Sequence, residues 1–235
     1  MRAVNKGLKP RDFNSYKEAR AYLTTRLGYY CSYCEMGTNN MIEVEHIEPV
    51  ANGGDKLEWD NFLLSCKYCN TNKSNHNQDR RNYFWPDIDN TDLLFEYSLF
   101  QPVVVKDSLP QNVKTIANNL IRLTGLDKYP NSVNTPTEAD TRWVVRTEVM
   151  FTAMESYNDF VEFLKTNPDQ ISIDRMIRSI CRESKIGFPS LWLQVYEYYP
   201  LVVEELINFW KERFNTYFEY QPDTTTRVVR PNGQI

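Results

Sequence analysis

The spacing of apolar residues along the chain predicts mostly helices, with a strand-containing segment near the N-terminus. Between residues 15 and 27, apolar positions recur every three or four residues after Asn14 or Ser15, either of which can cap a helix. Beyond Pro86, longer stretches with the same spacing are bounded by proline and glycine residues. These stretches predict helices at 110–124, 138–165, 172–185 and 190–214, the last with a break at Pro200.

The segment from residue 42 to residue 76 has a different pattern. Ile42 and Val44 alternate with polar residues up to His46, which favours a short strand, and glycines at 53 and 54 then indicate a loop. A second short helix is expected to begin near Asn70. Further on, residues 94–105 fit a hairpin, and the last fifteen or so residues are typical of a loose tail.

These patterns predict an α+β fold with two domains. Residues 1–85 would form a small domain with an N-terminal helix, and residues 86–235 a mainly α-helical domain that could serve as a docking platform for a partner. A hydrophobic content of 41% is enough for a sizeable core. No stretch approaches the roughly 20 apolar residues that span a bilayer, and the N-terminus lacks the apolar run of a signal peptide. We therefore expect a cytoplasmic protein without a membrane segment.

Four of the five cysteines form two Cys-x-x-Cys pairs, Cys31 with Cys34 and Cys66 with Cys69. Two such pairs can wrap one tetrahedral zinc ion, and four thiolate ligands leave no open position for catalysis. Paired redox or simply buried cysteines are the alternative. The sequence predicts a structural zinc site, and Cys181 is expected to be buried outside it.

Basic residues are concentrated in two stretches that lie before and after the net acidic segment 31–60. The formal net charge is only −4, but residues 1–30 hold seven basic and two acidic side chains, and residues 61–85 hold four basic and one acidic. Phosphates of a nucleic acid would have to lie against such stretches. A solvated helix face explains the same distribution equally well.

Between and after the cysteine pairs lie Glu45–His46, Asn61 and Asn70, in the stretches YCSYCE and WDNFLLSCKYCN. This arrangement resembles the HNH, or ββα-metal, endonucleases over residues 30–75. The resemblance implies a small zinc-stapled ββα-metal finger that hydrolyses phosphodiester bonds. Many members carry a third histidine where this chain has Asn70, so the chain corresponds to an HNN variant.

The resemblance also implies roles for these residues. His46 would be the general base, since imidazole titrates near neutrality. Glu45 and Asn70 would bind one catalytic ion, and the oxygen ligands favour Mg²⁺ or Mn²⁺ over a metal that prefers nitrogen. Asn61 would fix the loop that carries the histidine. Successive side chains of a strand point to opposite sides, so Glu45 and His46 share a site only if the strand end twists.

Several neighbouring residues have two interpretations. Lys73 could contact a phosphate or be a solvated lysine, and His76 lies outside the motif positions. Arg142 and Arg146, four apart on a predicted helix, could contact nucleic acid, although such pairs are more often surface salt-bridge partners.

The combination of the motif with a helical C-terminal half is similar to that of bacterial anti-phage HNH nucleases of the Septu PtuB type. That resemblance implies DNA as the substrate and an ABC-like ATPase as the partner that gates cleavage. RNA cleavage and a non-catalytic zinc finger that only binds nucleic acid are the alternatives. The zinc-finger alternative requires the motif residues to have no catalytic role.

Overall fold

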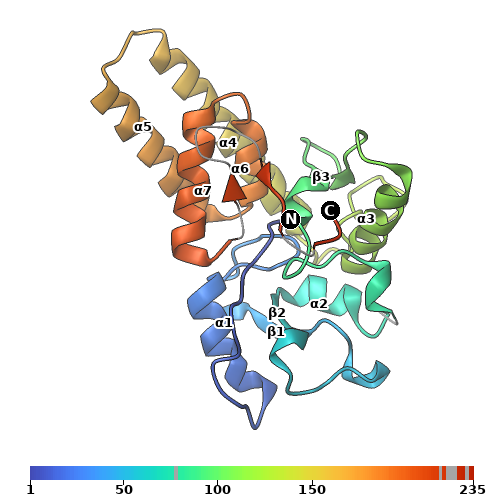
Figure 1. The fold of residues 1–235 in the computed structure, drawn as a ribbon. Coiled ribbons are helices and arrows are strands. Elements are labelled where there is room, and N and C mark those ends of the chain that lie inside the picture. Colours follow the sequence, from blue (N-terminus) through green and yellow to red (C-terminus); the bar gives the residue numbers. More distant parts are fainter. Residues whose placement is uncertain (77–78, 217–218, 221–226, 231–232) are drawn as a thin grey trace.

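The computed structural model describes residues 1–76, 79–216, 219–220, 227–230 and 233–235. Figure 1 shows four helices, α4 to α7, gathered on one side of the molecule, with the β1–β2 hairpin, α1 and α2 on the other. Mixed helices and small antiparallel sheets confirm the predicted α+β fold class. The principal helices are α1 (Ala19–Leu27), α2 (Lys67–Lys73), α3 (Gln111–Thr124), α4 (Arg142–Leu164), α5 (Gln170–Glu183), α6 (Pro189–Val195) and α7 (Pro200–Phe214).

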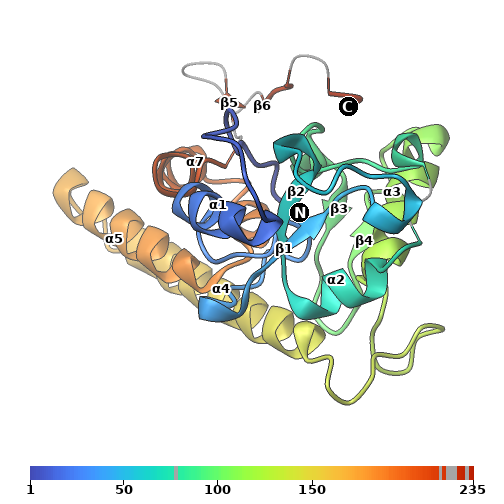
Figure 2. The same ribbon diagram turned by 90° about the horizontal axis from the view of Figure 1, so that it is seen from below.

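A two-stranded hairpin forms the centre of the N-terminal half. Strands β1 (Glu43–His46) and β2 (Phe62–Ser65) are antiparallel, with Glu45 opposite Leu63 and His46 opposite Phe62. Figure 2 shows the hairpin between α1 and α2, and both helices contact it. All four residues of β2 are buried, so the hairpin is part of the core rather than a surface ribbon.

The predicted helices of the C-terminal half are confirmed, with shifted ends. The α4 helix begins at Arg142 rather than at residue 138, and Thr141 is its N-cap. Asp169 caps α5 by accepting from the Ser172 amide, and α7 begins at Pro200, the predicted break. Proline fits this position because the first helical residue needs no amide donor. Among the described residues, no helix is both long and apolar enough to cross a membrane.

Two further strand pairs complete the fold. The predicted hairpin at 94–105 is present as β3 (Phe95–Glu96) and β4 (Val104–Val105). The prediction that the last fifteen or so residues form a loose tail is wrong for the described part of that segment. Strand β5 (Glu219–Tyr220) pairs with β6 (Arg227–Val228), and the Gln234 amide donates to Asp89 at 2.9 Å. Residues 221–226 and 231–232 lie outside the described residues.

Contacts cross the predicted domain boundary after residue 85. The buried carboxylate of Glu35 accepts hydrogen bonds from the amide and hydroxyl of Ser190 in α6. Val4 forms an isolated antiparallel bridge with Thr216, just after α7. One continuous cluster of buried hydrophobic residues spans both halves. The division into 1–85 and 86–235 stays a prediction, and the two segments pack as one body in this structure.

Arg142 and Arg146 are buried, which corrects both interpretations of the pair as surface residues. Arg142 makes a two-pronged ion pair with Asp140, and it also donates to the carbonyls of Thr124 and Gly125. A further donor, Nη1, lies 3.0 Å from the sulfur of Cys69. The guanidinium therefore joins the end of α3, the start of α4 and one cysteine of α2.

We expect Arg142→Met to lower the free energy of unfolding by about 3 to 5 kcal/mol, because it leaves the buried carboxylate of Asp140 without its partner. Urea denaturation followed by circular dichroism measures this change. Arg122→Met is the matched control, since Arg122 is exposed on α3 and its loss should cost less than about 0.5 kcal/mol. Equal stability of the two variants would contradict the role assigned to Arg142.

Candidate functional site

The four paired cysteines converge on one point in the core. Their sulfur atoms all lie within 4.8 Å of one another, and the Cys34 and Cys66 sulfurs are 3.7 Å apart. Sulfur atoms about 2.3 Å from a tetrahedral zinc are about 3.8 Å apart, so this set is close to the spacing that the ion needs. The cluster is compatible with structural zinc, as predicted, while Cys181 is buried elsewhere.

Protein groups alone do not stabilise four thiolates here. Burial raises the pKa of Cys34 and of Cys69 well above the usual thiol value. For Cys31, burial is outweighed by hydrogen bonds from the other three thiols, and its pKa is well below that value. Burial thus disfavours ionisation of two of the four thiols, and a bound divalent cation would supply the charge that lets them ionise.

Glu45 and His46 point to opposite sides of β1. The Glu45 side chain is only 2% exposed and lies under α2, where its Oε2 is 3.1 Å from the ammonium of Lys73. Tyr33 donates its hydroxyl to the other carboxylate oxygen. Burial raises the pKa of Glu45, while Lys73 and Tyr33 oppose that change. The prediction that Glu45 binds the catalytic ion stays a prediction, and in this arrangement both of its oxygens are engaged.

His46 is half-buried at the end of β1, and its surroundings fix its orientation. The ring packs edge-on against Tyr16 and Phe62, with centroids 5.0 Å and 5.3 Å away. Its Nε2 lies 3.1 Å from the carbonyl oxygen of Lys56. Because a carbonyl can only accept, the neutral ring must carry its proton on Nε2. That tautomer leaves Nδ1 with a free lone pair, as a general base requires.

Asn61 ties together the loop between the strands. Its Oδ1 accepts from the Glu48 amide at 2.7 Å, and its Nδ2 donates to the carbonyls of Glu48 and Asp55, both at 2.9 Å. Gly54 passes beside this amide, and a Cβ at that position would lie 2.1 Å from the Glu48 carbonyl oxygen. These are the contacts that the predicted loop-fixing role needs.

Asn70 lies in the first turn of α2, and Glu43 is its nearest acidic partner among the described side chains. Asn70 Nδ2 donates to Glu43 Oε2 at 2.8 Å. Glu43 is exposed and, being two residues before Glu45, lies on the same side of β1. The structure therefore brings Asn70 together with Glu43, whereas the described contacts of the His46 ring are with Tyr16, Phe62 and Lys56.

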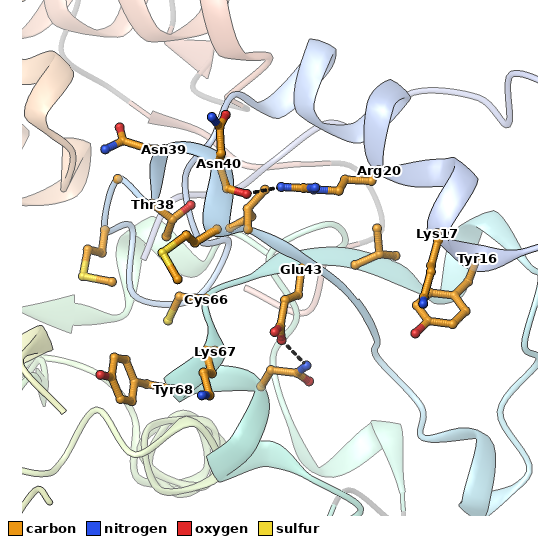
Figure 3. A pocket seen from close by; sticks show the side chains of 16 residues that line it. Tyr16, Lys17, Arg20, Thr38, Asn39, Asn40, Glu43, Cys66, Lys67 and Tyr68 are labelled. Carbon is orange, nitrogen blue, oxygen red and sulfur yellow. Dashed lines mark hydrogen bonds between the residues drawn. The ribbon is translucent and has the colours of Figure 1, made fainter. Parts of the chain in front are cut away.

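An open cleft of about 1000 Å³ runs along this hairpin. Figure 3 shows Lys17 and Arg20 on the α1 side, Lys67 and Tyr68 on the α2 side, and Glu43 between them, with its hydrogen bond to Asn70. Arg20 donates to the carbonyl of Asn40 and holds the loop that forms one end of the cleft. The cleft ends beside the candidate base, since Tyr16 both lines it and packs against His46.

Sequence reasoning assigned no role at the site to Tyr16, Tyr33 or Glu43. Alternation along β1 could have identified Glu43, because it predicts that residues 43 and 45 share a face. No local pattern indicates the two tyrosines, which reach the site through tertiary packing. Both interpretations of Lys73 were wrong, because its ammonium is buried between Glu45 and the carbonyl oxygen of His46, 2.6 Å away. The exposed His76 ring contacts the Asn72 carbonyl oxygen at 3.2 Å.

Zinc should be retained by the purified protein at one ion per chain, and Cys66→Ser should abolish this binding and unfold the finger. Structural zinc contributes about 10 to 16 kcal/mol of apparent binding free energy in finger peptides, which the remaining core cannot replace. Metal content by plasma mass spectrometry and helicity by circular dichroism measure both effects. Cys181→Ala is the control and should keep the zinc. Full zinc content in Cys66→Ser would contradict the four-thiol site.

Comparison with known proteins gives one match. Residues 31–76 match the family model described as HNH endonuclease. No curated protein and no solved structure matches the chain significantly. The matched segment begins at the first cysteine of the thiol cluster and includes β1, β2 and α2. Residues 31–76 are therefore similar to HNH endonucleases, and this matched segment contains all four clustered thiols as well as His46, Asn61 and Asn70.

Proposed function

We propose that this protein is a metal-dependent endonuclease that hydrolyses phosphodiester bonds in DNA, with His46 as its general base. The observation that carries the proposal is the orientation of the His46 ring within the matched domain. Its Nε2 faces the carbonyl of Lys56, which leaves Nδ1 available to accept a proton. An HNH domain acts on nucleic acid, and DNA is the substrate implied by the resemblance.

In the proposed reaction, Nδ1 of His46 takes a proton from a water molecule as its oxygen attacks the phosphorus. The new P–O bond forms while the bond to the leaving oxygen breaks, and that oxygen takes a proton from solvent. A bound Mg²⁺ or Mn²⁺ would stabilise the charge on the phosphate and the leaving oxygen. The edge-on contacts with Tyr16 and Phe62 hold the ring so that it loses little freedom when water binds.

We infer that the catalytic cation lies between β1 and the start of α2. Asn70 would be one ligand through its amide oxygen, and Glu43 and Glu45, on the same side of β1, are the candidate carboxylates. Glu43 already contacts Asn70, whereas Glu45 would have to leave a buried ion pair with Lys73. Glu43 can therefore bind the cation at a lower cost in free energy, because no buried ion pair has to break.

We further propose that the protein works in the cytoplasm as a nuclease effector of bacterial anti-phage defence, gated by an ABC-like ATPase. The support is the resemblance of its motif and helical C-terminal half to nucleases of the Septu type. A constitutive nuclease would also endanger its own cell. Helices α4 and α5 extend away from the HNH domain, which leaves surface for a partner (Figure 1).

His46→Ala should reduce DNA cleavage by about 10² to 10⁴-fold, since that is what a positioned general base contributes. Plasmid nicking with Mg²⁺ or Mn²⁺ measures the rate, with and without any ATPase that is encoded beside the gene. The variant should keep its zinc, because His46 is not part of the thiol cluster.

Two results would contradict this proposal in different ways. Absence of cleavage of both DNA and RNA under every metal condition would favour a binding module. Strong degradation by the isolated chain would refute gating by the ATPase but not the nuclease activity.

Glu43→Gln should weaken Mn²⁺ binding at least about tenfold, since a carboxylate ligand is lost, while Glu45→Gln should change it little. Electron paramagnetic resonance of free Mn²⁺ measures this without relying on activity. The two variants are a matched pair, because each removes one charge from the same face of β1. The reverse order of effects would show that Lys73 releases Glu45 when the cation binds.

A further inference from the structure

The cleft between α1 and the hairpin has the chemistry of a polyanion site. Lys17, Arg20 and Lys67 line it, and none of them has a carboxylate within ion-pair distance among the described residues. The only acidic residue in the described lining is Glu43, and the Asn70 amide holds its carboxylate. Three cations against one carboxylate give the cleft a positive charge in a chain whose formal net charge is −4.

The cations lie on opposite walls. Lys17 and Arg20 belong to the helical segment that begins at Tyr16, and Lys67 is the first residue of α2 (Figure 3). Both lysines are exposed, so their ammonium groups can reach a ligand without breaking an internal contact. Two walls of the same sign attract a ligand that is negatively charged along its length, and they repel other cations.

Side chains suited to nucleobases lie next to these cations, with Tyr16 beside Lys17 and Tyr68 beside Lys67 (Figure 3). Tyr16 and Tyr68 are partly exposed in the cleft, and the side chain of Met41 is 79% exposed at its edge. Aromatic rings next to a basic groove are the usual means of holding single-stranded nucleic acid, because bases stack on the rings while phosphates follow the cations. A paired duplex keeps its bases inside and cannot use these rings.

We propose that this cleft binds one unpaired polynucleotide strand and leads it to His46. The inference rests on the proposed nuclease function and adds the form of the substrate: a single strand, or a locally opened duplex. Lys17, Arg20 and Lys67 contact the phosphates beside the one that is cut. Tyr16 connects the cleft with the candidate base, because it lines the cleft and packs against the ring of His46.

The test measures binding rather than cleavage. In a His46→Ala background, fluorescence anisotropy with labelled oligothymidylate and with a labelled duplex of the same length gives both affinities over a range of salt concentrations. Lys17→Ala with Lys67→Ala should weaken single-strand binding about tenfold. It should also lower the slope of log affinity against log salt by about 1.4, since each lost phosphate contact contributes about 0.7 for a single strand. The intact cleft should prefer the single strand to the duplex.

Arg175→Ala with Arg178→Ala is the matched control, because it removes two exposed cations from α5, away from the cleft. That pair should leave affinity and salt slope unchanged. An unchanged salt slope in the lysine variant, or a duplex bound as tightly as the single strand, would overturn the proposal. Intact single-strand binding without any cleavage by the wild-type chain, even with an ATPase partner and Mg²⁺ or Mn²⁺ present, would refute the nuclease function alone.

Discussion

Four sulfur atoms within 4.8 Å of one another are the constraint on which the rest of the HNH-like segment depends. As thiolates they would repel each other, and as thiols they would leave the domain with a small core, so the arrangement calls for a cation at its centre. One pair of thiols precedes the hairpin and the other begins α2. Holding them together brings α2 against β1, and only then do Asn70 and Lys73 reach the carboxylates of that strand.

Alternation along β1 then separates two kinds of chemistry. Carboxylates at 43 and 45 face α2, while His46 turns toward Tyr16 and Phe62 on the other side. The Lys73 ammonium neutralises the deeper carboxylate and also holds the backbone of the histidine through its carbonyl. Lys73 thus contacts both the backbone of the candidate base, His46, and the carboxylate of Glu45, although the side chains of His46 and Glu45 point in opposite directions.

The sequence predicted the local features of this molecule better than the long-range ones. Cysteine spacing, the alternating residues of β1 and the proline and glycine boundaries of the helices depend on near neighbours, and these predictions agree with the structure. The loop contacts of Asn61, expected from the motif, are likewise made with residues close to it in the sequence. By contrast, Arg142 was expected on the surface because helical spacing says nothing about what a helix packs against. Its partner Cys69 is 73 residues away in the sequence, and no pattern links them.

The contact between Arg142 and Cys69 also limits how residues 31–76 can be transferred into another protein. A segment recognised as a domain is often treated as a module that evolution or an engineer can move into a new host. Here one sulfur of the thiol cluster receives a hydrogen bond from the helical half, and the same guanidinium is held by Asp140 from that half. A chimaera carrying only residues 31–76 would lose that donor. The transplantable unit is therefore discontinuous: the finger together with the start of α4.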